Sequence, residues 1–255
     1  ITKYIYRDSA NILHLTNHRK YFIHEVYVVP QYNPVSADTL TGIDTVRVDS
    51  IYFLCHGRQK HKLGVIEQNI LIQPNSFFNQ NEVDETYKKI SLLRNFKFIN
   101  IIFKEDVKQG TADTGYYPLD CYVQLTPYVA QSYLTEIEGT NNNGNFGAAV
   151  NLIYQHKNLF KRAYVFDFKI RGAYETLRNK EKTRTYNTFE YGAEARLSIP
   201  QFLLPLNHEG FIKKYTPKTA IVAAYNFQKR PDYSRIISVF SFGYNWKGSP
   251  YTIYV

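Results

Sequence analysis

Hydrophobic and polar residues alternate with a period of two along most of the second half of the chain. In the stretch AYVFDFKIRGAYE, residues 163–175, one column is apolar or glycine: Tyr164, Phe166, Phe168, Ile170, Gly172 and Tyr174. The other column carries the charges Asp167, Lys169, Arg171 and Glu175. A period of two is typical of an extended strand with one apolar face and one polar face.

Five further runs with this period follow Tyr128, and each is about 9 to 14 residues long. They occupy residues 132–140, 146–156, 188–200, 218–228 and 235–246, and a short seventh run occupies 251–255. Tilted strands of about 9 to 11 residues cross a bilayer, whereas strands of soluble sandwiches more often have about five or six residues. The lengths favour a membrane β-barrel, and a soluble barrel with its aromatic column inside stays open as the alternative.

The pattern before Tyr128 is different, because strand-like and helix-like periods both occur. It predicts strands at 20–30, 44–54, 95–105 and 119–128, and helices at 61–70 and 81–93. On the second helix, Val83, Tyr87, Ile90 and Leu93 form the predicted apolar face, and Asn81 with Asp84 supplies a candidate cap. This order of elements indicates a small α+β domain.

The predicted fold class is therefore an α+β domain followed by an antiparallel transmembrane β-barrel. We expect residues 1–19 to be the end of a preceding unit or a linker, 20–129 the α+β domain, and 130–255 the first six to seven barrel strands. About six strands cannot close around a polar lumen, and open edges do not survive in hydrocarbon, so we expect a part of a longer barrel. The absence of a starting Met fits an excised or mature piece.

The charged column is predicted to face a wet lumen, where opposite charges on neighbouring strands pair. The predicted lumen charges are Asp167, Lys169, Arg171, Glu190, Glu194 and Arg196. The apolar column then faces lipid, and its Tyr and Phe side chains near the strand ends resemble aromatic girdles.

The composition offers few candidate residues for binding or catalysis. The net charge is +9, but Lys and Arg are dispersed among acids, so no nucleic-acid partner is expected. Cys55 and Cys121 fit a disulfide or two buried thiols equally well, and His56 and His61 are expected in a solvated loop. No catalytic motif is present, so we expect no enzyme, no cofactor and no metal.

Several segments resemble one protein family. The segment from Leu71 to Glu105, with a Pro-containing turn, a Tyr-x-x-Ile helix and the strand NFKFINI, resembles the barrel-proximal POTRA domain of BamA/TamA-like outer-membrane assembly proteins. The segment from Glu136 to Glu175, with its NLF turn, resembles the opening barrel strands of that family, and PQFLLP at 200–205 resembles a later turn. The likeness is greatest to the TamL lipoprotein type of Bacteroidota.

The resemblance implies a sixteen-stranded barrel with a weak seam between its first and last strands, and a periplasmic POTRA domain. Such proteins insert or export outer-membrane clients without catalysis. The implied partners are unfolded outer-membrane proteins, other assembly-module subunits such as a TamB-like periplasmic protein, and outer-membrane lipid. The expected client-binding edge of the POTRA domain comprises Phe96, Phe98, Asn100, Ile101 and Ile102. The family's Arg-Gly loop signature and a lipidated Cys are absent from this chain.

The run SYLTEIEGT is the expected seam strand, with Tyr133, Thr135, Glu136, Ile137 and Gly139 as its seam residues. Tyr133 and Ile137 are predicted to face lipid and the Glu side chains the lumen, with little side-chain interlocking, so that an opened edge accepts a client strand. Three alternative functions stay open. They are a two-partner-secretion-type transporter, the membrane anchor of an enzyme encoded upstream, and a soluble β-rich binding module.

Overall fold

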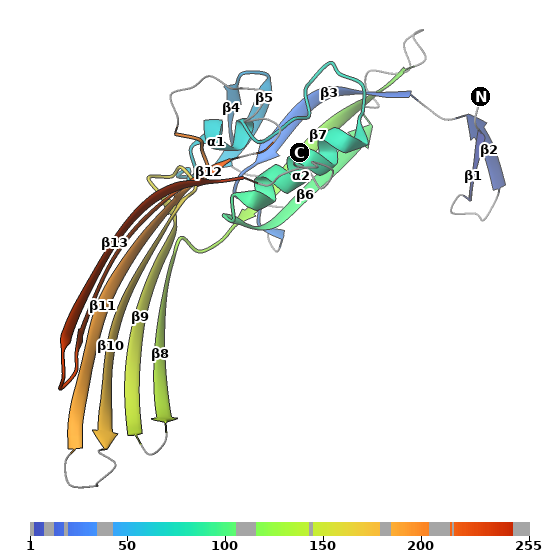
Figure 1. Cartoon of the computed structure of the whole chain (residues 1–255). Helices are drawn as coiled ribbons and strands as arrows, with labels where there is room; N and C mark the ends of the chain where they lie inside the picture. The colour runs from blue at the N-terminus through green and yellow to red at the C-terminus, as the bar shows by residue number, and fades with distance from the viewer. Residues whose placement is uncertain are drawn as a thin grey trace, which may run out of the picture. The chain divides into compact units, whose positions relative to one another are not determined.

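The computed structural model of the chain describes residues 3–7, 13–17, 20–34, 43–105, 116–142, 145–178, 185–203, 215 and 217–246 (Figure 1). The chain divides into two compact units, Ile1–Pro127 and Tyr128–Val255. We call them unit 1 and unit 2 and describe each by itself. The predicted functional assignments of the segments stay predictions.

Unit 1 contains a mixed five-stranded sheet with the order β4-β5-β3-β7-β6. Its elements are β3 (Lys20–Val29), β4 (Ile43–Val48), β5 (Ile51–His56), α1 (Leu63–Glu67), α2 (Gln80–Leu92), β6 (Phe96–Glu105) and β7 (Tyr116–Pro127). Strand β3 is parallel to both β5 and β7, and the other pairs are antiparallel. A separate two-stranded sheet joins β1 (Lys3–Arg7) to β2 (Leu13–Asn17), so the predicted linker includes a β-hairpin.

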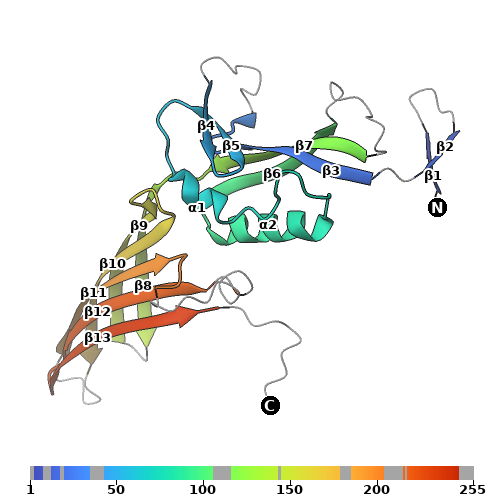
Figure 2. The same cartoon turned by 90° about the horizontal axis from the view of Figure 1, so that it is seen from above.

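The core of unit 1 lies between the sheet and its helices, which Figure 2 shows on one side of the sheet. Alternate residues of the central strands are buried there, joined by one residue from each helix: Ile23, Val26, Val28, Phe53, Cys121, Val123, Leu125, Ile66 and Ile90. The buried Thr86 of α2 accepts a hydrogen bond from the backbone N of Leu71 at 2.9 Å, which ties the helix to the preceding loop.

Several local predictions in unit 1 were wrong. The predicted strand at 44–54 is a hairpin, because Asp49 adopts a positive φ of 50° in a turn between β4 and β5. Helix α1 has five residues and ends before Asn69. In α2 the cap is Asn79, whose side chain accepts from Asn81 N at 3.1 Å, and Tyr87 is exposed rather than buried.

Unit 2 contains an antiparallel six-stranded sheet in which consecutive strands are neighbours, β13-β12-β11-β10-β9-β8 (Figure 1). Its strands are β8 (Gln131–Asn142), β9 (Asn145–Leu159), β10 (Tyr164–Arg178), β11 (Thr185–Ile199), β12 (Lys218–Lys229) and β13 (Ser234–Asn245). Each contains 12 or 15 residues. The six predicted strands are therefore confirmed. The predicted run at 251–255 lies outside the described residues, as do residues 143 and 144 between β8 and β9.

The NLF segment ends β9 and leads into the turn before β10. Phe160, Lys161 and Ala163 adopt φ values of 57°, 61° and 62°, and the Asn158 side chain accepts from Ala163 N at 3.1 Å. Asn158 therefore closes the turn with a hydrogen bond across five residues. Of PQFLLP, the described part follows β11, where Gln201 O accepts from Thr219 Oγ1 at 2.8 Å.

Candidate functional site

The strand register of unit 2 places the predicted apolar columns of all six strands on one side of the sheet. Phe168 lies opposite Tyr154 and Ala195, and these positions continue to Tyr133 at one edge and to Phe240 at the other. We call this side the apolar face and the opposite side the polar face. The sequence prediction that these columns form a common surface is confirmed.

Large side chains on the apolar face are exposed even though they are hydrophobic. Ile137 is 79 % exposed and Phe240 is 75 % exposed. Others that are exposed are Tyr133, Phe146, Val150, Leu152, Ile170, Tyr174, Phe189, Tyr191, Tyr225, Ile236 and Phe242. Soluble monomers rarely expose continuous apolar patches of more than a few hundred Å². This face therefore requires an apolar environment or a cover.

Most aromatic side chains on the apolar face lie on either side of a row that contains a single aromatic residue, Tyr225. The row contains Thr135, Leu152, Ile170, Ala193, Tyr225 and Ser238, which are successive partners across the sheet. On one side of it, the Tyr133 and Tyr154 ring centroids lie 5.0 Å apart. On the other side, Tyr191 and Phe227 lie 4.8 Å apart, and Tyr174 and Phe189 lie 5.2 Å apart. Such a distribution resembles the apolar band between two aromatic girdles of a membrane barrel.

The polar face carries a line of contacts that crosses five strands. We call its members the polar chain: Glu138 of β8, Asn151 of β9, Arg171 of β10, Glu190 of β11 and Asn226 of β12. Asn151 Nδ2 donates to Glu138 Oε1 at 2.8 Å, and Asn226 Nδ2 donates to Glu190 Oε1 at 2.9 Å. At each end of the polar chain, a carboxylate and an amide on neighbouring strands thus form a hydrogen bond.

Arg171 connects the two ends of the polar chain. Its Nη1 lies 3.4 Å from both Glu138 Oε2 and Asn151 Oδ1, and its Nε lies 4.0 Å from Glu190 Oε1. The residue opposite Arg171 on β11 is Gly192, which is also opposite Asn226. A Cβ at Gly192 would lie 3.3 Å from Asn226 Nδ2 and 3.0 Å from Tyr225 O. Because glycine has no side chain, there is space at this position for Asn226 to lie close to the other members of the polar chain.

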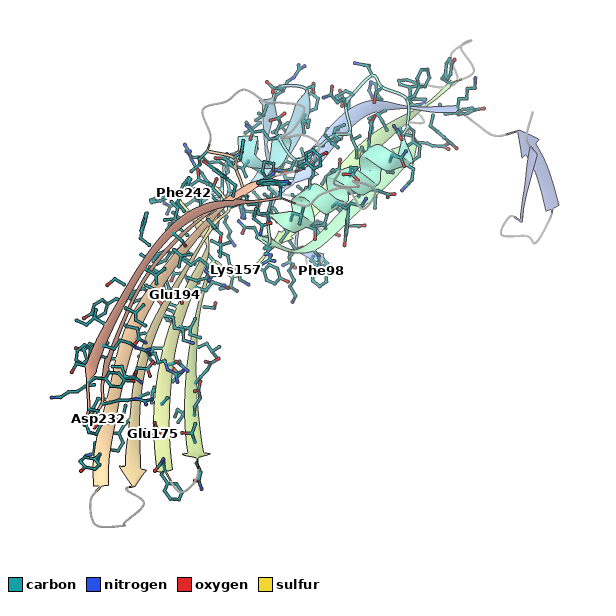
Figure 3. All side chains as sticks on the ribbon, in the orientation of Figure 1. Phe98, Lys157, Glu175, Glu194, Asp232 and Phe242 are labelled. Carbon is teal, nitrogen blue, oxygen red and sulfur yellow. The ribbon has the colours of Figure 1, made fainter. Side chains whose placement is uncertain are left out.

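The other predicted lumen charges lie on the polar face but outside the polar chain. Asp167 Oδ1 accepts from Gln155 Nε2 at 2.6 Å, and Arg196 pairs with Glu194 on the same strand at 3.3 Å. Lys169 lies directly opposite Glu194. Figure 3 labels Glu194 near the middle of the sheet, and Glu175 and Asp232 toward the end that carries the turn between β12 and β13.

Strand β8, the predicted seam strand, is an edge of the sheet and pairs with β9 alone among the described strands. Tyr133, Thr135, Ile137 and Gly139 lie on the apolar face, and Glu136 lies on the polar face. On the β9 side, side chains connect the two strands, whereas weak pairing with a closing strand stays a prediction. Both Glu136 and Glu138 accept hydrogen bonds from the buried Asn151. Their role in a seam stays a prediction.

In unit 1, the predicted client-binding strand β6 is likewise an edge strand, paired with β7. Phe96 is buried, whereas Phe98 is 55 % exposed and projects from β6 in Figure 3. Asn100 Nδ2 donates to Gln124 Oε1 at 3.0 Å, and Ile101 and Ile102 are half-buried. Only part of the predicted set is therefore accessible from outside the unit.

The histidines and cysteines of unit 1 have structural surroundings. His61 is 6 % exposed and packs its ring 4.9 Å from that of Phe96, so its assignment to a solvated loop was wrong, while His56 is exposed. Burial, with repulsion from Lys60, lowers the pKa of His61 to about 4. Cys55 and Cys121 are free thiols, and burial raises the pKa of Cys121 to about 12.

Within the described part of the chain, one group of side chains could share a metal ion: His24, Glu25 and Asp120, whose ligand atoms lie within 4.8 Å of one another. They lie at a β-bulge between β3 and β7. His24 Nδ1 lies 3.2 Å from Asp120 Oδ1, so two of the three already pair with each other. This arrangement explains their proximity without an ion.

Fifty-one chains of solved structures match this protein, including the following two. BamA from Haemophilus ducreyi lacking POTRA domains 1-3 matches with 10 % identity and a TM-score of 0.39, covering 98 % of this chain and 50 % of that one. CdiB from Acinetobacter baumannii matches with 9 % identity and a TM-score of 0.35, covering 91 % of this chain and 58 % of that one. This chain thus spans about half the length of either structure.

No family model and no curated protein matches the chain. With TM-scores below 0.5, neither likeness assigns it to a family. No helix in the described residues is long and apolar enough to cross a membrane.

The sequence analysis did not identify two members of the polar chain, Asn151 and Asn226, or the glycine beside them, Gly192. The sequence contains only weak indications of these three residues. Asn151 lies between Ala149 and Ile153 in its column, and Gly192 interrupts the charged column of β11. Their roles can be recognised only when the register between neighbouring strands is known, and the pattern along a single strand does not determine that register.

Proposed function

We propose that this chain is part of an outer-membrane β-barrel of the BamA/TamA-like assembly or translocation kind. Unit 2 supplies membrane-crossing strands, and unit 1 is a periplasmic POTRA-like domain that captures extended outer-membrane clients. Client recognition occurs through backbone hydrogen bonds at strand edges and needs no catalytic side chain. The proposed partners are unfolded outer-membrane proteins, accessory assembly subunits and outer-membrane lipid.

The exposed apolar face is the single observation that carries the proposal. Its strands contain 12 or 15 residues, enough to cross a bilayer when tilted, and a row with a single aromatic residue lies between aromatic groups. The opposite face is polar, and several of its charges are paired. A lipid-facing side and a water-facing side explain both surfaces together, because hydrocarbon accommodates the exposed aromatics and a wet lumen accommodates the ions.

Unit 1 fits client capture through its free edge. Strand β6 ends the sheet, and an edge strand presents unpaired N–H and C=O groups to an incoming extended chain. In unit 2 the edges β8 and β13 would each need a further strand in hydrocarbon, where every unpaired backbone group costs several kcal/mol. The proposal therefore includes further barrel strands beside both edges.

The test uses two neighbouring residues of β9 that have similar size and lie on opposite faces. Leu152 is half exposed on the apolar face, opposite Ile170, and Ile153 lies on the polar face, opposite Lys169. In lipid, Leu152→Asp should destabilise the protein by roughly 2 kcal/mol, because it places a carboxylate in hydrocarbon. Ile153→Asp should cost much less, because its carboxylate faces Lys169 and the lumen.

The measurement is a denaturant titration of the protein folded into phosphatidylcholine vesicles. If the apolar face lies in water, Leu152→Asp instead leaves stability unchanged or improves solubility. Equal losses for the two variants, or a stable monomer without any amphiphile, would contradict the proposal.

A further inference from the structure

The end of the unit 2 sheet that carries the β9–β10 turn contains basic but no acidic residues in the part that the structure describes. The described residues at this end are 128–131, 156–164, 199–203, 215, 217–219 and 244–246. Four of them are Lys or Arg, and we call these four the basic rim: Lys157, Lys161, Arg162 and Lys218. The opposite end is mixed, since Figure 3 shows Glu175 and Asp232 there, away from Lys157. An end of one charge sign favours an anionic partner.

The β9–β10 turn displays an aromatic ring and two cations in a fixed conformation. Phe160 is 69 % exposed, and Lys161 and Arg162 are exposed as well. Phe160 and Lys161 have left-handed φ values of 57° and 61°, which residues other than glycine adopt only at a cost. Two backbone hydrogen bonds of 3.2 Å, from Lys161 N to Asn158 O and from Arg162 N to Leu159 O, hold the turn. The exposed side chains therefore keep defined positions.

The turn lies at the depth of lipid head groups when the centre of the apolar face lies at the bilayer midplane. Leu152 is the central residue of β9, and Leu159, the last residue of the strand, follows seven positions later. With a rise of about 3.3 Å per residue and a tilt of about 40°, Leu159 lies about 18 Å from the midplane. Head groups occupy the layer between about 15 and 22 Å. The turn follows Leu159 directly, so its cations lie among the phosphates.

Aromatic rings connect the basic rim to the apolar face. Tyr164, the first residue of the apolar column of β10, lies opposite Leu159, the neighbour of Phe160. Trp246 is 50 % exposed and follows β13 at the same end. Aromatic side chains beside cations are typical of the boundary between hydrocarbon and head groups. An acidic protein would match the charges but would not account for rings that continue the apolar face.

We propose that the basic rim binds the phosphate groups of anionic phospholipids, with the Phe160 ring inserted among the head groups. Resting on the proposed function, the inference names the class of lipid that contacts this end of the barrel wall. Long Lys and Arg side chains extend toward the phosphates, while their aliphatic stems lie along apolar surroundings. Each such residue near an anionic surface raises the affinity roughly fivefold.

The lipid beside the turn can be measured by fluorescence, because the chain contains a single Trp. Trp246→Phe combined with Phe160→Trp moves this reporter to the turn, where the native ring is already exposed. The full chain is folded into vesicles that contain equal amounts of phosphatidylcholine and phosphatidylglycerol. One lipid at a time carries bromine on its acyl chains near the head group, and bromine quenches Trp fluorescence on contact. The two quenching efficiencies give the relative association constant of phosphatidylglycerol over phosphatidylcholine at the turn.

This constant should be about five to twenty at low salt, the effect of one or two basic residues, and should fall toward one at about 0.5 M salt. Lys161→Gln with Arg162→Gln should lower it toward one at low salt. Lys161→Arg with Arg162→Lys retains both charges and should keep the preference. The matched control, Lys229→Gln with Arg230→Gln, removes two charges at the opposite end and should leave the constant unchanged.

A constant near one at low salt, or one that the double Gln variant of the turn leaves unchanged, would overturn the inference. In the first case, binding of a soluble polyglutamate peptide that is lost in this variant would assign the basic rim to an acidic protein. Flotation with vesicles of phosphatidylcholine alone tests the proposed function separately. A chain that floats but shows no lipid preference contradicts only the inference, whereas a chain that does not float contradicts both.

Discussion

Units 1 and 2 are both built on sheets of alternating side chains, but they place the apolar column in different surroundings. In β7 of unit 1, Cys121, Val123 and Leu125 are fully buried on the side of the sheet where the core lies. In β13 of unit 2, Phe240 and Phe242 are exposed. Alternation thus defines two faces of a strand, and the elements that follow along the chain determine whether the apolar face becomes an internal core.

The largest expected effect is the difference in unfolding free energy that one substitution, Phe to Ala, causes in the two units. Phe53→Ala removes a fully buried ring from unit 1 and should lower its free energy of unfolding by about 3–5 kcal/mol. Phe240→Ala removes an exposed ring and should cost only about 1–2 kcal/mol when unit 2 is in lipid, since only transfer from water to hydrocarbon is lost. Urea unfolding of the protein in vesicles, with separate probes in each unit, measures both values.

Two outcomes of the Phe240→Ala measurement would contradict this comparison of the units. If Phe240→Ala costs as much as Phe53→Ala, the apolar face of unit 2 packs against protein rather than lipid. If Phe240→Ala has no effect in vesicles, the face is not inserted.

The next effect concerns the pH response of unit 1, where a histidine is part of the core. The pKa of His61 is lowered to about 4 in the folded state, against an ordinary value of 6.5. Between these values the unfolded chain binds a proton that the folded unit does not, so the stability of unit 1 should fall as the pH drops from about 6.5 to 4. The loss should approach about 3 kcal/mol, because one pKa unit corresponds to about 1.4 kcal/mol.

Urea titrations of unit 1 probes at pH 7.5 and 4.5 test this expectation. His61→Leu should remove most of the pH dependence, whereas His56→Gln, which alters an exposed side chain, should leave it in place. The same acid sensitivity in His61→Leu would show that other groups cause it.

The sequence predicts the fold of unit 2 better than that of unit 1, for a physical reason. A period of two sustained over a dozen residues leaves few alternatives to a long strand, so all six strands and both faces of the sheet were predictable. In unit 1 the segments are short, and the turn at Asp49 contains neither Gly nor Pro, so the β4–β5 hairpin resembled one strand. The buried position of His61 depends on its packing against Phe96, which no local pattern indicates.

The candidate site was predictable only in part. The charges of the polar face were found from alternation, because each lies in a visible column. The polar chain joins residues from Glu138 to Asn226, and its members become neighbours only once five strands have been aligned. Gly192 matters because of the side chain it lacks, and that role exists only in the register observed.

The smallest expected effect concerns the free edge of unit 1, which is the counterpart of the β8 edge in unit 2. Along β6, the N–H groups of Asn100 and Ile101 point in opposite directions, one toward β7 and one toward the open edge. Proline at the inward position removes a ladder donor and should destabilise unit 1. Proline at the outward position should leave the urea midpoint nearly unchanged while weakening the binding of an extended client by about fivefold to tenfold, the effect of one backbone hydrogen bond. Fluorescence anisotropy with a labelled unfolded outer-membrane protein segment measures this affinity, and the urea midpoint identifies which of Asn100→Pro and Ile101→Pro is the outward variant. If that variant binds the segment as tightly as the unmodified protein, clients do not pair with β6, and the edge has no part in their capture.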